Sequence, residues 1–225
     1  MSASIPVIPR ASNNSIRKYI GIAMLTFLTT LPLTTHAASS SVSKWSGVVV
    51  YAGDSKVSSG VPVSKCHILT NEHAVRGEQR VTVKISGENY QADVVSIDTA
   101  HDLSLLKVAT CPIDHYAKIS KVQPIKGDTV TSIYYKSGIF INRIIQTSGK
   151  FLGYLDVVTV EDKNMFSMLI DDSHPRKGAS GGGVATKNGL VSVIFGVANR
   201  NNKPQTFAVD YFSLTDFLTK NHIQN

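Results

Sequence analysis

The sequence has few of the residues that staple small folds or bind metals. Its 225 residues include only two cysteines, and they contain no HExxH pattern and no short-spaced group of cysteines and histidines. A zinc-stabilised or disulfide-rich scaffold is therefore excluded, and we expect no metal and no cofactor. In an oxidising compartment Cys66 and Cys111 can pair and close a loop of roughly 45 residues. Two separate buried thiols are the alternative.

Dense charge is also missing. Charged residues make up 17% of the chain, and the formal net charge of +7 is spread without an arginine-rich or lysine-rich block. Nucleic-acid binding proteins usually concentrate basic residues on one face or stripe. We therefore expect no nucleic-acid partner, although a basic surface for anionic polymers remains an alternative.

No apolar run reaches the roughly 20 residues that a membrane span needs. The longest, at 19–28, follows Arg17 and Lys18 and precedes the small residues Thr35 and Ala37. This order is typical of a signal peptide, so residues 1–37 are predicted to be cleaved and residues 38–225 to be exported to the periplasm or secreted. No stable membrane insertion is expected after cleavage. An uncleaved membrane anchor is the alternative.

The sequence is rich in short runs of valine and isoleucine bounded by Gly, Ser, Asn and Asp. Such runs at regular spacing favour an antiparallel all-β fold. Strands are predicted at 47–52, 66–70, 80–86, 91–98, 103–109, 129–135, 139–147, 155–159, 167–170, 190–198 and 206–209. The clusters 58–60 and 86–89 are predicted turns, and two prolines between 112 and 124 mark a connector between two halves.

A short helix is predicted near the C-terminus. Ser213 is the expected N-cap, and Leu214, Phe217 and Leu218 follow at the spacing that places them on one helix face.

The most unusual segment is Gly178-Ala179-Ser180-Gly181-Gly182-Gly183. Glycines permit rare backbone dihedrals and close approach of a ligand, so Ser180 is a candidate nucleophile. A glycine-rich hairpin turn is the alternative. A serine nucleophile needs a histidine base and a carboxylate that orients the base.

Two residues in the first half suit these roles. His73 follows one predicted strand directly, and Asp102 precedes another. Asp98 is a second candidate for the carboxylate, whereas His101 and His174 are interpreted as surface or pocket-wall residues.

These three segments resemble the motifs of the chymotrypsin-like (trypsin-like) serine endopeptidases. The motifs read Leu-Thr-Asn-Glu-His-Ala-Val at 69–75, His-Asp-Leu-Ser-Leu-Leu-Lys-Val at 101–108 and Gly-Ala-Ser-Gly-Gly at 178–182. Their order of His, Asp and Ser is also the family's. The resemblance covers about 45–218 and implies two six-stranded antiparallel β-barrels, at about 45–115 and about 120–225, with a short C-terminal helix.

The resemblance also implies a function, namely peptide-bond hydrolysis through an acyl-enzyme intermediate. Ser180 would attack the scissile carbonyl, His73 would act as base and then acid, and Asp102 would orient the imidazole. The backbone N–H groups of Gly178 and Ser180 would form the oxyanion hole. Protein or peptide substrates and a monomeric enzyme are expected. A catalytically silent protease-fold protein for binding or adhesion is the alternative.

The sequence departs from the digestive and clotting members of this family at Ala179, where those members carry an aspartate that pairs with a freed amino terminus. The likeness is therefore to the bacterial exported branch. By resemblance, the walls of the primary specificity pocket come from His174, Phe195, Gly196, Val197 and Phe207. Because none of these is acidic, cleavage after basic residues is disfavoured, and an acidic or medium-sized apolar residue is expected there.

Overall fold

The computed structural model describes residues 45, 47–53, 56–138, 142–159, 162–172, 174–175, 177–200 and 202–224. The predicted signal peptide at 1–37 and the beginning of the strand predicted at 139–147 lie outside the described residues. In the described ranges, no helix is long and apolar enough to cross a membrane.

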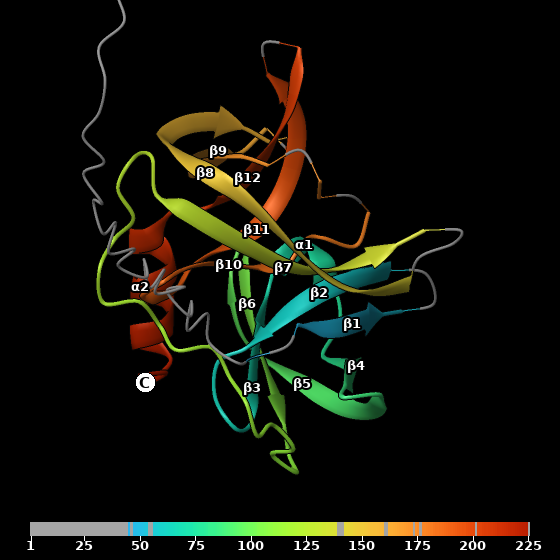
Figure 1. Ribbon diagram of the computed structural model, residues 1–225. Coiled ribbons are helices and arrows are strands. Elements are labelled where there is room, and N and C mark those ends of the chain that lie inside the picture. Colours follow the sequence, from blue (N-terminus) through green and yellow to red (C-terminus); the bar gives the residue numbers. More distant parts are fainter. Residues whose placement is uncertain are drawn as a thin grey trace, which may run out of the picture. The chain divides into compact units, whose positions relative to one another are not determined.

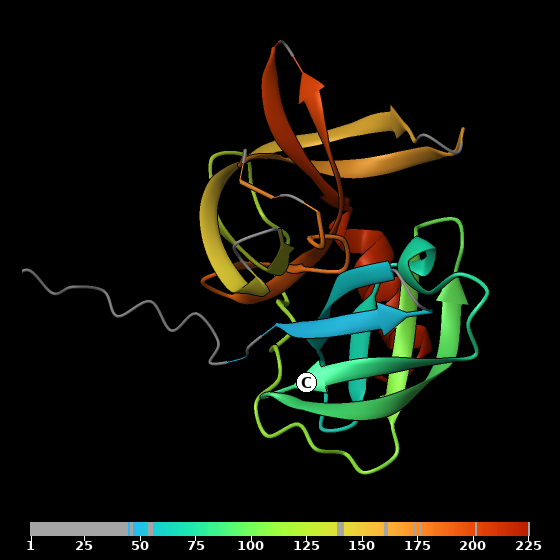
Figure 2. The same ribbon diagram turned by 90° about the vertical axis from the view of Figure 1, so that its right-hand side faces the viewer.

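The first six strands form one closed antiparallel barrel in the order β1-β2-β3-β6-β5-β4. Figures 1 and 2 show them gathered in blue to green. The strands are β1 (Val48–Ala52), β2 (Lys56–Pro62), β3 (His67–Thr70), β4 (Arg80–Ile85), β5 (Glu88–Asp98) and β6 (Leu103–Val108). β4 alternates buried valines with more exposed polar residues, the pattern of a strand with one face toward a core.

The other six strands form a second closed antiparallel barrel in the order β10-β11-β12-β9-β8-β7. They are β7 (Thr129–Ser137), β8 (Asn142–Val158), β9 (Asn164–Asp171), β10 (Gly183–Thr186), β11 (Gly189–Arg200) and β12 (Lys203–Val209). The predicted all-β class with two six-stranded barrels is therefore confirmed.

Each barrel has its own apolar core, and a further cluster joins them. The core of the first barrel includes Val50, Ile68 and Leu106, and that of the second includes Met168 and Ile170. The joining cluster combines residues from both barrels with one face of helix α2 (Tyr211–Lys220): Trp45, Leu69, Leu103, Leu190, Val193, Leu214 and Phe217. Hydrophobic burial of this kind is the main force that holds such a fold together.

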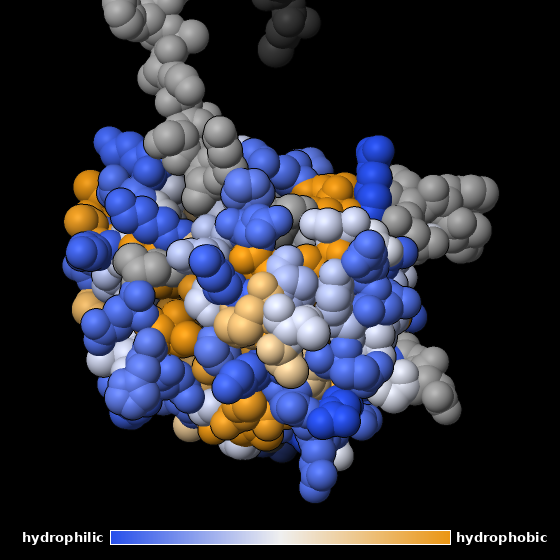
Figure 3. All heavy atoms as spheres, turned by 90° about the horizontal axis from the view of Figure 1, so that it is seen from below, coloured by the Kyte–Doolittle hydropathy of each residue, from blue (hydrophilic) through white to orange (hydrophobic). Residues whose placement is uncertain are grey.

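A few large hydrophobic residues of the described chain are exposed on its surface. Figure 3 shows a largely hydrophilic face on which hydrophobic residues form several separate patches. Scattered exposed apolar residues are normal for a folded domain.

The structure corrects three local predictions. Residues 58–60 lie inside β2 rather than in a turn, and all three are buried. β8 is one strand of 17 residues where two were predicted, and it is bent by an irregularity between Phe151 and Gly153. The N-cap of α2 is Asp210 rather than Ser213, because the Asp210 carboxylate accepts hydrogen bonds from the backbone N–H groups of Phe212 and Ser213.

A disulfide joins Cys66 and Cys111. Cys66 precedes β3 and Cys111 follows β6, and these two strands pair from His67 with Lys107 to Thr70 with Ser104. The bridge therefore lies at one end of the β3–β6 pair. At the opposite end of the pair, β3 leads into the segment that carries His73, and β6 begins directly after Asp102.

Candidate active site

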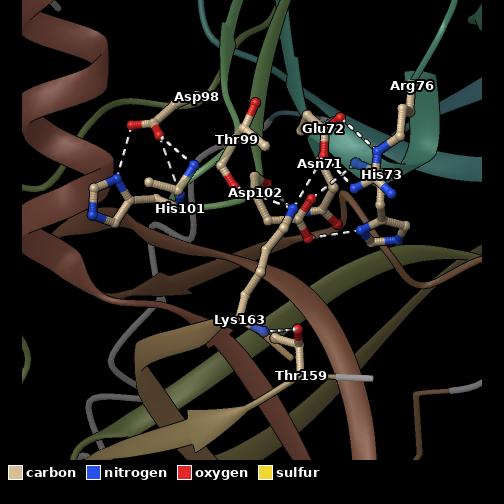
Figure 4. A network of polar contacts seen from close by, with 11 residues as sticks. Asn71, Glu72, His73, Arg76, Asp98, Thr99, His101, Asp102, Thr159 and Lys163 are labelled. Carbon is tan, nitrogen blue, oxygen red and sulfur yellow. Dashed lines mark hydrogen bonds and ion pairs between the residues drawn. The ribbon is translucent and has the colours of Figure 1, made fainter. Parts of the chain in front are cut away.

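His73 and Asp102 meet at the end of the first barrel. His73 lies on α1 (Glu72–Val75), which follows β3 after a single residue, and Asp102 directly precedes β6. The His73 Nδ1 atom is 2.7 Å from Asp102 Oδ2, and the His73 backbone N–H donates to Asp102 Oδ1 at 2.9 Å. Figure 4 shows the ring edge facing the carboxylate. Both carboxylate oxygens are thus used to hold one histidine.

The backbone of Asp102 is held in an uncommon conformation. Its φ of +55° lies in the left-handed region, which residues other than glycine rarely adopt. The Asn71 side chain donates from Nδ2 to the Asp102 carbonyl oxygen at 2.9 Å, and both residues are buried. Asn71 therefore positions the carboxylate. The sequence motif contained Asn71, but nothing in its spacing identified this contact.

The loop that carries Ser180, residues 177–182 before β10, is called the Ser180 loop below. It is shaped by glycines and backbone hydrogen bonds. Gly178 and Gly181 have φ values of +93° and +81°. The Gly181 N–H donates to the Ile194 carbonyl at 2.9 Å, and the Gly182 N–H donates to the Ala179 carbonyl at 2.8 Å. A methyl group on Gly181 would overlap the Ser59 carbonyl oxygen, so only glycine fits there.

Two N–H groups of this loop have no acceptor among the described residues. In the part of the chain that the structure describes, neither the Gly178 N–H nor the Ser180 N–H donates to a protein acceptor. The Lys177 carbonyl, which belongs to the same peptide unit as the Gly178 N–H, accepts from the Ser137 N–H at 3.0 Å. Because the peptide is planar and trans, the Gly178 N–H points away from β7.

The candidate nucleophile and the candidate base line separate hollows. His73 and Asp102 line a cleft of about 680 Å³, and Ser180 lines a pocket of about 330 Å³. Gly196 and Val197 line both. Among the described residues no hydrogen bond joins the Ser180 hydroxyl to the His73 ring. Catalytic hydrogen bonds are often long without substrate and tighten when it binds.

In the described part of the chain, apolar residues and three basic residues line the large cleft. Phe195 and Phe207 both line it, with ring centroids 6.4 Å apart. The strand pairing shifts between Ile194 and Gly196, so Phe195 is the extra residue of a β-bulge. The lining also includes the basic residues Lys56, Arg76 and Lys163.

The predicted pocket residues are thus divided. Gly196 and Val197 line the Ser180 pocket, whereas Phe195 and Phe207 line only the larger cleft. His174 lines neither of these two hollows; its side chain is 68% exposed, and its Nδ1 atom is 2.8 Å from Asp172 Oδ1. The assignment of the primary specificity pocket remains a prediction.

The alternative carboxylate, Asp98, contacts His101. Its Oδ2 atom is 2.8 Å from His101 Nδ1, and neither residue lines the two hollows. Burial acts to raise the pKa of Asp98, but the hydrogen bonds and charge of His101, with the Ala100 N–H, outweigh burial and lower that pKa. Asp98 therefore does not orient His73.

A second ionic group flanks the histidine. Glu72 is buried and accepts from Arg76 Nε at 2.7 Å and from its Nη2 at 2.5 Å. Lys163, next to β9, reaches across to within 3.9 Å of Glu72 Oε2 and donates to the Thr99 carbonyl at 3.4 Å (Figure 4). This contact ties the second barrel to the edge of the first beside the candidate dyad.

The described residues contain no group of three or more His, Cys, Asp or Glu side chains arranged to hold a metal ion. The chemistry that the arrangement supports is proton transfer by His73 and nucleophilic attack by Ser180, with charge stabilised by backbone N–H groups.

A model of the trypsin-like peptidase domain matches residues 46–192, which is more than half of the chain. Serine protease Rv3671c of Mycobacterium tuberculosis is 30% identical over 146 residues, covering 62% of this chain and 36% of that protein. Serine protease Do-like HtrB of Bacillus subtilis is 28% identical over 132 residues, covering 56% and 29%. The chain thus spans about a third of the length of these curated relatives.

Solved structures share the fold. The active form of the Rv3671c protease superposes with a TM-score of 0.68 at 21% identity, covering 80% of this chain and 82% of that one. The MamO protease domain of Magnetospirillum magneticum superposes with a TM-score of 0.62 at 19% identity, covering 80% and 96%. At such identities the likeness shows the fold alone.

Proposed function

This chain belongs to the trypsin-like peptidase family, and on that premise we propose that it is a serine endopeptidase that acts through His73, Asp102 and Ser180. Its relatives named as serine proteases support the proposal. The observation that carries it is the His73–Asp102 pair, 2.7 Å apart, at a cleft that shares two wall residues with the Ser180 pocket.

The proposed reaction uses each group for one step. With Nδ1 bound to Asp102, the other ring nitrogen of His73 takes the proton of the Ser180 hydroxyl as that oxygen attacks the scissile carbonyl. The N–H groups of Gly178 and Ser180 stabilise the developing oxyanion, and each such donor raises kcat by a factor of about 10²–10³. His73 then protonates the leaving amine as the peptide bond breaks. In the second half, His73 takes a proton from water, the water oxygen attacks the acyl-enzyme, and His73 returns the proton to Ser180 as it leaves.

A fluorescent phosphonate probe tests the proposal, because it reacts only with an activated serine. The wild type is expected to become labelled and to digest a denatured protein, whereas Ser180→Ala does neither. His73→Gln should also abolish both. His101→Gln is the matched control, since that histidine contacts a carboxylate in the same way but lies outside the cleft. A folded wild type without labelling or digestion would refute the proposal.

The competing function is a silent protease fold used for binding or adhesion. The separation of Ser180 and His73 into different hollows is the observation that favours it. The same labelling experiment decides between the two, because a silent fold leaves Ser180 unreactive at every probe concentration.

The specificity proposal rests on the pocket beside Ser180. Its described walls include Pro175, Ala179, Ile194 and Val197, and Lys177 is the charged residue among the described lining. We expect a medium-sized apolar or an acidic residue before the scissile bond and little cleavage after lysine or arginine. Mass-spectrometric mapping of cleavage sites in a peptide library checks this preference; predominant cleavage after basic residues would contradict it.

Export completes the proposal. Residues 1–37 are proposed to direct the chain to the periplasm or the medium, where the mature protein acts as a monomer on protein or peptide substrates. An intact-mass measurement of the purified native protein should show loss of these residues, and light scattering should give the mass of one chain. Retention of the segment would instead support the anchor alternative.

A further inference from the structure

Ser59 lies at the junction between the two halves of the candidate site. It is fully buried in β2 of the first barrel. Its backbone N–H donates to the Ser180 carbonyl at 2.7 Å, and its carbonyl accepts from the Thr70 hydroxyl at 2.8 Å. Thr70 stands three residues before His73. The backbone of Ser59 therefore connects the segment that carries the base with the loop that carries the nucleophile.

The Ser59 hydroxyl makes a further connection. It donates to the Gly178 carbonyl at 2.6 Å and accepts from the Tyr135 N–H at 2.8 Å. β10 pairs with β7 only as far as Ile133. Beyond that point the Tyr135 N–H is taken by Ser59 and the Ser137 N–H by the Lys177 carbonyl. The Ser59 hydroxyl thus bridges β7 to the Ser180 loop.

This bridge acts on the conformation of Gly178. The dihedrals of a residue set the angle between the peptide planes on either side, and glycine has wide freedom in both. At Gly178 one plane is held through the Lys177 carbonyl and the other through the Gly178 carbonyl. With both planes held, the φ of +93° is maintained and the Gly178 N–H keeps its direction.

We propose that Ser59 is a positioning residue, whose hydroxyl holds Gly178 in the conformation that directs its N–H toward the oxyanion of the reacting substrate. The inference rests on the proposed protease function. Without the hydroxyl, one of the two peptide planes at Gly178 loses its anchor, and the Gly178 carbonyl and the buried Tyr135 N–H lose their partner. Substrate binding in the cleft is left intact, because Ser59 lines neither hollow.

The test compares Ser59→Ala with Ser58→Ala, measured on a fluorogenic peptide amide chosen for the wild type. Ser58 is the matched control: it is the neighbouring buried serine of the same strand, and its hydroxyl has no hydrogen-bond partner among the described residues. We expect Ser59→Ala to lower kcat about tenfold, equivalent to about 1.4 kcal/mol in the transition state, with KM nearly unchanged. Ser58→Ala should retain the wild-type kcat.

The phosphonate labelling rate gives an independent readout, because phosphonylation of the serine also develops charge in the oxyanion hole. It should fall in Ser59→Ala by a factor similar to that in kcat. Equal kcat values in the two alanine variants, or a loss confined to KM, would overturn the role of Ser59 while leaving the protease function standing. No labelling in the wild type would instead refute the protease function and this inference with it.

A folding failure of Ser59→Ala is covered by Ser59→Cys. A thiol is a weaker donor than a hydroxyl, so kcat should fall between those of the wild type and Ser59→Ala. A folded Ser59→Cys with wild-type kcat would count against the proposal as clearly as an active Ser59→Ala.

Discussion

In the first barrel, His73 and Asp102 are held by side-chain hydrogen bonds, whereas in the second barrel the Ser180 loop is held mainly by backbone bonds and by the absence of side chains. Asp102 uses both carboxylate oxygens on His73 and is itself held by Asn71. The Ser180 loop instead packs glycines where a methyl group would meet backbone atoms.

The difference follows from what each group must do. A base must keep one tautomer and one ring orientation, and side-chain acceptors specify these. An oxyanion hole must present N–H groups, and only the conformation of the main chain specifies their direction. Changes that remove a polar side chain should therefore be most damaging at the site residues of the first barrel. Changes that add a side chain should be most damaging in the Ser180 loop of the second barrel.

The largest effect is expected from Asp102→Asn. Only one of the two terminal atoms of an amide can accept a hydrogen bond, so the amide cannot replace both carboxylate oxygens that accept from the backbone N–H and Nδ1 of His73, and the wrong ring tautomer is favoured. We expect kcat to fall about 10⁴-fold with the fold retained. Asp98→Asn is the control and should keep nearly full activity. Comparable losses in the two variants, measured by peptide hydrolysis, would show that the carboxylates had been assigned wrongly.

The corresponding change in the second barrel is Gly181→Ala. The added methyl would overlap the Ser59 carbonyl and the Thr70 hydroxyl, and the φ of +81° is strained for alanine. We expect a loss of about 4 kcal/mol in the free energy of unfolding, together with loss of phosphonate labelling.

Gly196→Ala tests whether this loss reflects bulk at a packed site. No atom lies within 4 Å of a Cβ added at Gly196, so the unfolding midpoint should stay near that of the wild type. Denaturant titration of both variants provides the comparison. Equal stability of the two would show that the Ser180 loop is less tightly packed against β2 than the structure indicates.

The same contrast explains what the sequence predicted. The all-β class was predictable from strand periodicity, which is a local pattern, whereas the two barrels were implied by the family resemblance of the motifs at 69–75, 101–108 and 178–182. The two local motifs at 69–75 and 101–108 also contain the residues that make the His73–Asp102 contact. β2 was missed because residues 58–60 have the composition of a turn. Their small size instead lets the Ser180 loop pack against β2, which depends on a segment about 120 residues away in sequence.

Pocket walls were less predictable for a related reason. The bulge in β11 places Gly196 opposite Phe207, and the His174 ring contacts Asp172. Neither feature has a periodic signal in the sequence, since both arise from tertiary contacts and strand register.

The disulfide provides a smaller and purely structural contrast, since both cysteines of the chain lie in the first barrel. Cys66→Ala combined with Cys111→Ala should lower the free energy of unfolding by about 3 kcal/mol, because the bridge restricts the unfolded chain. The bridge lies at the end of β3–β6 opposite the dyad, so kcat of the folded variant should not change. Calorimetry and peptide hydrolysis measure the two quantities; a tenfold loss of kcat would show that the bridge positions the dyad.

The smallest effect is expected at the Asp98–His101 pair, which repeats the histidine–carboxylate contact of the dyad outside the cleft. The folded pKa of Asp98 is below its ordinary value of 3.8, so ionised Asp98 stabilises the fold above that pH. This contribution is lost as the pH falls through the folded pKa. Because the side chains are 26% and 44% exposed, it should be under about 1 kcal/mol. The stability advantage of the wild type over Asp98→Asn should therefore be present at neutral pH and vanish in strong acid. If the stability advantage of the wild type grew on acidification, the contact with His101 would not be holding Asp98 ionised. The Asp98–His101 pair would then differ from the His73–Asp102 pair in more than its position.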